Sequence, residues 1–147
     1  MSHYAHRTAF DTNLLIALML DWHIHHAKVL QATEYIFKKE VPIVPIPVFT
    51  ECYSVLTRLP PPHRLSPTHA ETLLRNNFKK RILLAPFPQD HLWNYIALLE
   101  KDQIAGGKTY DAQILFCAQH AGATRLLTLN DKDFRVLTHW GVEIISP

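Results

Sequence analysis

Strand-like and helix-like segments alternate along this chain of 147 residues, and this alternation is the strongest constraint on its fold. Short runs rich in Val, Ile, Leu and Thr are separated by longer stretches whose apolar residues recur at helical spacing. Strands that alternate with helices favour a parallel sheet covered by helices. The sequence therefore predicts an α/β fold.

The expected strands are a first one that ends at Asp11, followed by residues 41–45, 81–85, 125–129 and 142–145. The expected helices are a short one after Asp11, residues 22–39 capped by Asp21, one opened by Pro47, residues 67–80 capped by Ser66, residues 90–101, and one capped by Thr109. The core faces of the last two helices are assigned to Leu92, Ile96 and Leu99, and to Tyr110, Ile114, Cys117, Ala118 and Ala121.

Length and composition suit one globular domain over residues 1–147, because 48% of the residues are hydrophobic and the chain is too short for two full cores. The apolar run from Leu14 to Leu20 is far shorter than the roughly 20 residues that a membrane span needs. Cys52 and Cys117 lie in apolar patterns typical of reduced core cysteines. We expect a cytoplasmic protein that does not contact a membrane.

Asp11 stands between the apolar strand of residues 8–10 and the apolar segment that begins at Leu14. Burying an unpaired carboxylate costs on the order of several kcal/mol unless a cation or hydrogen bonds compensate its charge. Glu51, Asp111 and Asp133 also stand at places where carboxylates are unexpected. Ligands of open α/β sheets bind beyond the carboxyl ends of the strands, so the four acids predict one divalent-metal site at that edge.

Three of these acids also have a structural explanation of their own. Glu51 and Asp111 lie in the first turns of helices, where the helix dipole favours a negative charge. Asp133 belongs to a polar turn after a strand. Their joint placement favours the metal site, and a site of carboxylate oxygens suits Mg²⁺ or Mn²⁺ rather than Zn²⁺.

Four segments, FDTNLLI (10–16), PVFTE (47–51), GGKTYDA (106–112) and LTLNDKDF (127–134), resemble the PIN-domain ribonucleases of the VapC toxin type. The similarity covers essentially the whole chain. It implies a three-layer α/β/α fold with a central, mostly parallel sheet, a Mg²⁺ or Mn²⁺ site, cleavage of RNA and a cognate antitoxin protein. On this basis Asp11 and Asp111 are the expected direct metal ligands, and Glu51 and Asp133 complete the catalytic set.

The fourth acid is left open between neighbouring positions. Asn130 stands where some relatives have a carboxylate, whereas Asp133 matches those that carry the acid just before Phe134. Asn130, Asp131 and Asp133 are therefore all candidates for the metal. Asn13 and Thr128 are expected to hold the ligands in place through hydrogen bonds.

The segment from position 58 to position 81 contains six basic residues and only one acidic residue, Glu71. They form either a solvated helix face or an electrostatic lip that holds the RNA backbone. The six are Arg58, Arg64, Arg75, Lys79, Lys80 and Arg81. Trp22 or Trp93 offers an aromatic face for a base, or else belongs to the core or to a subunit interface.

The leading hypothesis is a metal-dependent endoribonuclease that serves as the toxin of a toxin–antitoxin pair and forms a homodimer. A haloacid-dehalogenase-like phosphatase is an alternative, because Asp11 after a first strand also fits a nucleophilic aspartate. That family needs an aspartate two residues later, where this chain has Asn13. A catalytically silent nucleic-acid-binding module is a further alternative, although four acids facing phosphates argue against it.

Overall fold

The computed structural model describes residues 6–147. Its elements, in chain order, are β1 (Thr8–Phe10), α1 (Thr12–Met19), α2 (His26–Lys39), β2 (Ile43–Pro45), α3 (Ile46–Thr57), α4 (Pro67–Phe78), β3 (Leu83–Ala85), the 3-10 helix η2 (Gln89–His91), α5 (Leu92–Lys101), α6 (Lys108–His120), β4 (Arg125–Leu127), α7 (Asp131–Arg135), the 3-10 helix η3 (Thr138–Trp140) and β5 (Glu143–Ile145).

The five strands form one sheet in the order β3-β2-β1-β4-β5, and every neighbouring pair is parallel. The chain adds strands on one side of β1 and then crosses over to add β4 and β5 on the other side. The order reverses between β1 and β4, where Phe10 pairs with Leu127. Ligand sites of open α/β sheets form at such a reversal.

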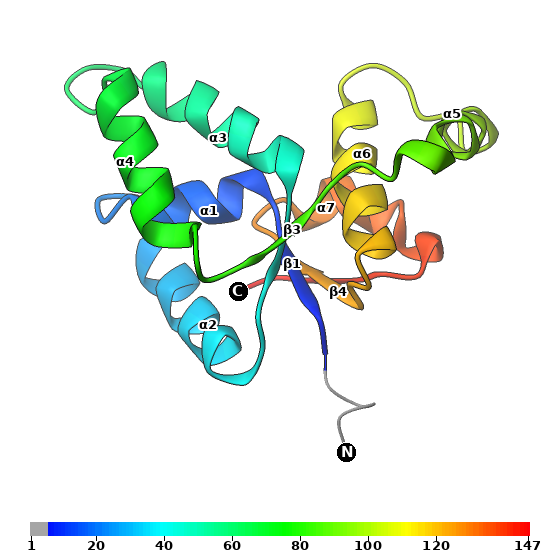
Figure 1. Cartoon of the computed structure of the whole chain (residues 1–147), viewed down its shortest axis with the longest axis horizontal. Coiled ribbons are helices and arrows are strands. Elements are labelled where there is room, and N and C mark those ends of the chain that lie inside the picture. Colours follow the sequence, from blue (N-terminus) through cyan, green and yellow to red (C-terminus); the bar gives the residue numbers. More distant parts are fainter. Residues whose placement is uncertain (1–5) are drawn as a thin grey trace.

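Helices cover both faces of the sheet, which confirms the three-layer α/β/α prediction. Figure 1 shows α1 to α4 on one side of the strands and α5, α6 and α7 on the other. A hydrophobic cluster built on Phe10, Leu14 and Leu56 fills the first side, and one built on Leu115, Leu126 and Trp140 fills the second. Among the helices of residues 6–147, none combines the length and the apolar character required to cross a bilayer.

The predicted strands are all present but shorter than expected. Each has three residues, and β3 begins at Leu83 rather than at residue 81. Pro45 lies in β2 between two other strands, although proline donates no ladder hydrogen bond. Pro45 is the last residue of the strand, opposite Ala85 of β3, and the end of a strand is a position where proline is tolerated. Cys52 and Cys117 are free and buried, as predicted.

Several helix details differ from the expectation. Ser66 caps α4 as predicted, but α2 begins only at His26, so Asp21 does not cap it. Gly107 precedes α6 without a side-chain cap, so Thr109 lies inside that helix. Tyr110 is 66% exposed and not part of the core face of α6.

The prediction of the core face of α5 was also wrong in part. Leu99 is buried as predicted, but Tyr95 takes the other core position, and its hydroxyl donates a hydrogen bond of 2.8 Å to the carbonyl of Thr109. Leu92 and Ile96 instead point outward with about two fifths of their surface exposed. Helix α5 therefore has apolar side chains on two faces, and only one of them packs against the protein.

Candidate active site

The candidate site lies at the carboxyl edge of the sheet, at the reversal between β1 and β4. Asp11 follows the last residue of β1, and Thr128 follows the last residue of β4. Helix α3 begins directly after β2 and carries Glu51 in its second turn. Helix α6 runs back toward the start of β4, so its first turn, with Asp111, lies at the same edge. The topology alone thus brings three acids together.

Asp11 is almost fully buried and has two hydrogen-bond partners. Its Oδ1 accepts from the backbone N–H of Leu14 at 3.1 Å, which makes Asp11 the N-cap of α1. Its Oδ2 accepts from the hydroxyl of Thr128 at 2.5 Å. These bonds give Asp11 a structural role, yet each carboxylate oxygen keeps a further lone pair for a cation.

Burial raises the pKa of Asp11 from its usual value to about 6. The hydrogen bonds from Thr128 and Leu14 oppose that rise, while the negative charges of Asp111 and Glu51 add to it. Carboxylates act on one another in this way only when they are close. The raised pKa of Asp11 is thus mainly an effect of burial, and the smaller contributions of Asp111 and Glu51 indicate that these acids lie near it.

Asp111 is half-buried and belongs to the same electrostatic cluster. Its pKa is raised mainly by burial, and then by the charges of Asp133 and Glu51. Lys108, one helical turn earlier, lowers it. Asp111 is thus coupled to all three other candidate acids, and Glu51 and Asp133, both exposed, flank it from α3 and α7.

The structure distinguishes the neighbouring candidates after β4. Asp131 forms an ion pair with Arg135 one turn later, at 2.7 Å, and this contact lowers the pKa of Asp131. Asp133 has an electrostatic effect on Asp111, whereas Asp131 has none that is resolved. Asn130 precedes α7, and its backbone N–H donates to the Thr128 hydroxyl at 2.9 Å.

The side chains do not form a closed chelate. Among residues 6–147, no group of three His, Cys, Asp or Glu side chains is near enough to hold a metal ion directly. The donor set nevertheless fits a hard divalent cation, which keeps several waters and is commonly bound through one or two carboxylates. Asp11 and Asp111 are the residues that could hold such an ion, with Glu51 and Asp133 beside them.

Two residues near the site were missed by the sequence analysis. The hydroxyl of Thr12 is buried and has no hydrogen-bond partner, the only such side-chain atom found between residues 6 and 147. Lys108 lies three residues before Asp111 on α6 and lowers its pKa, and that spacing on a helix could have identified it. Asn13, an expected support, is exposed in the first turn of α1.

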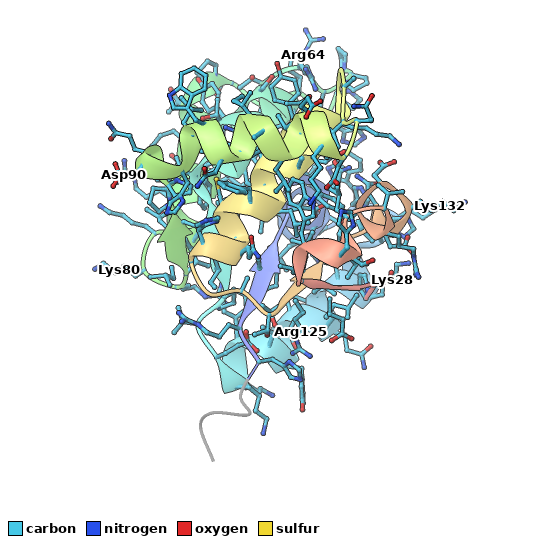
Figure 2. All side chains as sticks on the ribbon, turned by 90° about the vertical axis from the view of Figure 1, so that its right-hand side faces the viewer. Lys28, Arg64, Lys80, Asp90, Arg125 and Lys132 are labelled. Atoms are coloured by element: carbon cyan, nitrogen blue, oxygen red, sulfur yellow. The ribbon has the colours of Figure 1, made fainter. Side chains whose placement is uncertain are left out.

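The six basic residues do not form one continuous patch. Arg75, Lys79, Lys80 and Arg81 line a shallow pocket at the end of α4. Arg58 and Arg64 lie before the start of that helix, and Figure 2 shows Arg64 and Lys80 far apart. Arg58 follows Glu51 by seven residues and caps the carboxyl end of α3, which ends at Thr57.

Solved structures show the same fold. Residues covering 92% of this chain align with 97% of a Mycobacterium tuberculosis structure described as VapC20, a sarcin-ricin loop cleaving toxin, with a TM-score of 0.68 and 14% identity. The VapBC2 complex of Rickettsia felis, bound to a DNA fragment from its promoter, aligns over 95% of this chain and 98% of the other with a TM-score of 0.70 and 16% identity.

Two curated relatives are closer in sequence. Ribonuclease VapC40 of Mycobacterium tuberculosis is 35% identical over 119 residues, which are 80% of this chain and 82% of the relative. Ribonuclease VapC27 of the same species is 34% identical over 134 residues, 89% of this chain and 93% of the relative. The PIN domain family model matches residues 9–139. This leaves no support for a haloacid-dehalogenase-like phosphatase, and the chain belongs to the PIN-domain family, in its group of VapC ribonucleases.

Proposed function

We propose that this chain is a Mg²⁺-dependent endoribonuclease that hydrolyses RNA phosphodiester bonds and acts as the toxin of a toxin–antitoxin pair. The observation that carries the proposal is the coupling of the buried Asp11 to Asp111 and Glu51 at the reversal of the strand order. A buried acid with a raised pKa in a cluster of acids is a recurrent sign of a functional site. The names of the two ribonuclease relatives support the same activity.

Asp11 and Asp111 would hold the cation, with Mn²⁺ as an alternative to Mg²⁺. The bound ion supplies Lewis-acid polarisation of the scissile phosphate and lowers the pKa of a coordinated water. Thr128 keeps the carboxylate of Asp11 turned toward the sheet edge, and the backbone of Asn130 holds Thr128 in turn. Glu51 and Asp133, both exposed, would complete the metal shell, bind a second ion or orient the attacking water.

Arg58 and Arg64 are our candidates for contacts with the RNA backbone. Arg58 lies about 10 Å from Glu51 along α3, given the rise of 1.5 Å per residue. Arg64 lies in the loop that follows, where its Nε donates to the carbonyl of Leu59 at 2.9 Å. A strand that crosses the acidic centre would thus meet positive charge two helical turns away.

The remaining parts of the proposal concern the setting of the enzyme. Residues 1–147 would work as one PIN domain in the cytoplasm, as a homodimer, with a cognate antitoxin as partner. Support for the antitoxin comes from structural relatives that are toxin–antitoxin complexes, one of them from Klebsiella pneumoniae with 24% identity and a TM-score of 0.62. The catalytically silent alternative predicts RNA binding without cleavage.

Cleavage of a labelled RNA by the purified chain, with and without Mg²⁺, tests the proposal. We expect strand scission that requires the ion and is lost in Asp111→Asn. The matched control is Asp90→Asn, an exposed aspartate on η2 outside the cluster, which should cleave at the wild-type rate. Full activity of Asp111→Asn, or cleavage that chelators leave unchanged, would contradict the metal-dependent mechanism.

A further inference from the structure

The loops that follow α1 and α3, residues 20–25 and 58–66, meet at the ends of these helices that lie away from the sheet. Both helices begin at the carboxyl edge, α1 directly after Asp11 and α3 directly after β2, and they pack against each other. Figure 1 shows both of them leading away from the strands. In the two loops, the ring of Trp22 stacks on the ring of His63, with ring centres 3.9 Å apart and planes inclined by 24°.

The stacked pair leaves aromatic surface open to solvent. Trp22 is 47% exposed even though its indole lies on His63, which is exposed as well. Hydrogen bonds within the two loops hold the backbone: the N–H of His23 donates to the carbonyl of Leu20 at 3.0 Å, and the N–H of His63 donates to the carbonyl of Pro60 at 3.0 Å. The pair is therefore a preformed aromatic surface, and binding on it does not first have to order the loops.

Two arginines lie in the same loops. Arg64 follows His63 directly, and its Nε donates to a backbone carbonyl at 2.9 Å, which leaves its two terminal nitrogens for an anion. Arg58 follows the last residue of α3, and within residues 6–147 neither arginine forms an ion pair. Asp21 is the one acid in the two loops. Exposed aromatic rings beside positive charge are the combination that binds single-stranded nucleic acid.

We propose that the Trp22–His63 pair is a stacking site for an unpaired base of the RNA substrate, with Arg58 and Arg64 on the neighbouring phosphates. Bases of any sequence stack on aromatic side chains, and only unpaired bases offer a free face. The inference rests on the proposed ribonuclease function and deepens it, because it names single-stranded RNA as the substrate that this chain holds.

The stacking site lies within reach of a strand that crosses the acidic cluster. Helix α1 has eight residues, so its end lies about 12 Å from its start beside Asp11. A strand bound at both places must extend over that distance beyond the nucleotide at the acids. The stacking site thus favours RNA that is unpaired over several nucleotides on one side of the cleaved bond.

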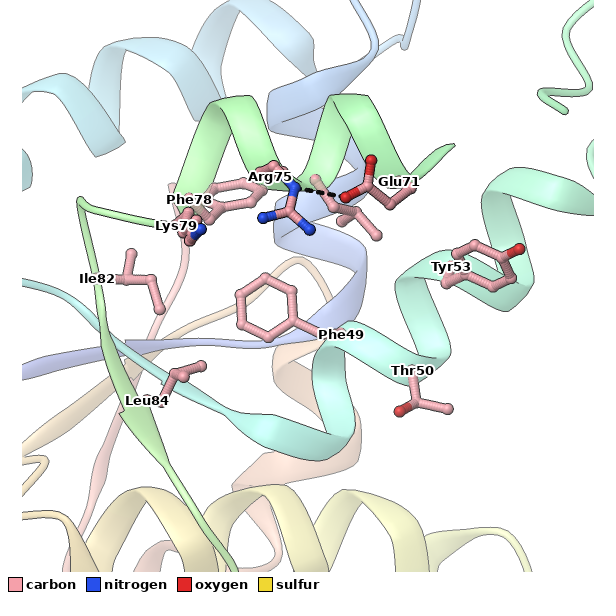
Figure 3. Close-up of a pocket in the computed structure, with 10 residues that line it drawn as sticks. Phe49, Thr50, Tyr53, Glu71, Arg75, Phe78, Lys79, Ile82 and Leu84 are labelled. Atoms are coloured by element: carbon pink, nitrogen blue, oxygen red, sulfur yellow. Dashed lines mark hydrogen bonds and ion pairs between the residues drawn. The ribbon is translucent and has the colours of Figure 1, made fainter. Parts of the chain in front are cut away.

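Two other exposed surfaces fit RNA less well. Trp93 on α5 is 77% exposed, but Asp90 precedes it by three residues and would repel phosphates beside it. The cations at the end of α4 border an apolar groove, and Figure 3 shows Arg75 directed toward Glu71, with which it forms an ion pair. These differences favour the Trp22–His63 pair as the place for a base.

The affinity for a labelled single-stranded RNA of about eight nucleotides, measured by fluorescence anisotropy, tests the stacking site. The parent protein is Asp111→Asn, which should hold RNA without cleaving it. Adding Trp22→Ala should weaken binding about tenfold, equivalent to about 1.4 kcal/mol, and Trp22→Phe should restore most of the affinity because it keeps an aromatic face. Trp93→Ala on the same parent is the matched control and should bind like the parent.

The dependence of binding on salt separates the arginines from the stacked ring. Arg64→Gln should reduce the slope of log K against log salt concentration by about 0.7, the value for one phosphate contact of a single strand. Trp22→Ala should weaken binding and leave this slope unchanged, because it removes no charge. Lys80→Gln, on a residue that Figure 2 shows far from Arg64, should change neither the slope nor the affinity.

RNA with a single abasic nucleotide identifies the stacked base. At one position, removal of the base should weaken binding to the parent but not to Trp22→Ala, because both changes remove the same contact. The same RNA annealed to its complement should bind both proteins equally, since paired bases offer no free face. Equal affinity of the parent and Trp22→Ala for the single strand would overturn the stacking site. No binding to the parent at about 100 µM, far above a micromolar Kd, would overturn it as well.

Failure of the stacking site and failure of the proposed function give different results. Binding that depends on Trp22, together with a wild-type chain that never cleaves the RNA, would contradict the nuclease function and leave the stacking site intact. Cleavage by the wild type that Trp22→Ala performs with the same KM and the same affinity would contradict only the stacking site.

Discussion

The hydroxyl of Thr128 joins the end of β4 to the carboxylate of Asp11 at the end of β1, across the point where the strand order reverses. The two residues are 117 positions apart in the chain. The bond lowers the pKa of a carboxylate that burial raises, so it favours the charged form that binds a cation. Thr128 thus influences the ionisation of the Asp11 carboxyl group.

Thr128→Val should therefore shift the pH dependence of activity upward. Without the hydroxyl, burial acts on Asp11 unopposed by this bond, so its pKa rises above about 6 and cation binding at neutral pH weakens. Thr128→Ser retains the donor and is the matched control. The pH profile of kcat/KM for the three proteins checks this; superimposable profiles for Val and wild type would contradict it.

The metal-free protein should lose stability as the pH rises from about 4 to 6. Asp11 has a folded pKa of about 6 against 3.8 for the free side chain, so the folded state binds more protons in that window. The free energy of unfolding should therefore be about 3 kcal/mol higher below pH 4 than above pH 6, because each unit of difference between the folded and unfolded pKa of Asp11 contributes about 1.4 kcal/mol. Urea titrations across this range in a chelating buffer measure the change.

Asp11→Asn should flatten that pH dependence. Asparagine also caps helices well, and the Thr128 hydroxyl can rotate to accept from the new amide, so local structure is retained. The melting temperature at pH 7 should be equal to or above that of the wild type, while RNA cleavage is lost. A variant that melts lower and remains active would show that Asp11 serves only as a helix cap.

The sequence predicted the fold because its strands are short apolar runs and its acids sit at strand and helix ends. It did not predict which side of α5 packs, since Leu92 and Ile96 recur at helical spacing as regularly as Tyr95 and Leu99. Tertiary contacts decide between the two faces, because Tyr95 packs on Phe87 and Phe116 and its hydroxyl donates to the carbonyl of Thr109. The exposure of Tyr110 depends in the same way on tertiary contacts that helical periodicity does not contain.

Among the candidate site residues, Asp11, Thr128 and Asp111 were predictable from strand ends and a helix start. The choice of Asp133 over Asp131 came from the resemblance, in which the acid stands just before Phe134, and the ion pair that Asp131 forms with Arg135 is a difference between the two acids that only the structure shows. That ion pair engages Asp131, whereas the charge of Asp133 raises the pKa of Asp111. The composition of this polar turn does not show which of its two aspartates is held in an ion pair.

Asp133→Ala should reduce RNA cleavage more than Asp131→Ala. Asp133 acts on Asp111 electrostatically, whereas Asp131 is held by Arg135 at the surface. Removing Asp133 should also lower the pKa of Asp111, because a neighbouring negative charge disappears. Rates for the two variants on one RNA substrate at one Mg²⁺ concentration decide the order. Equal activity of Asp133→Ala and wild type would move the role to Asp131 or leave three acids in the site.

An inhibitory antitoxin segment should insert an Arg or Lys among the acids of the site. The cluster around Asp111 is negatively charged without metal, and a guanidinium or ammonium group forms charge-assisted hydrogen bonds with carboxylates. Such a segment, disordered before binding, would occupy the place of the cation, so added Mg²⁺ or Mn²⁺ should weaken its binding. Neutralising its inserted basic residue should cost about 1–3 kcal/mol, as for a buried charged hydrogen bond. Calorimetry of the cognate peptide with wild type and Asp111→Asn, each with and without Mn²⁺, measures both effects. An affinity that neither change alters would show that inhibition occurs away from the acidic centre.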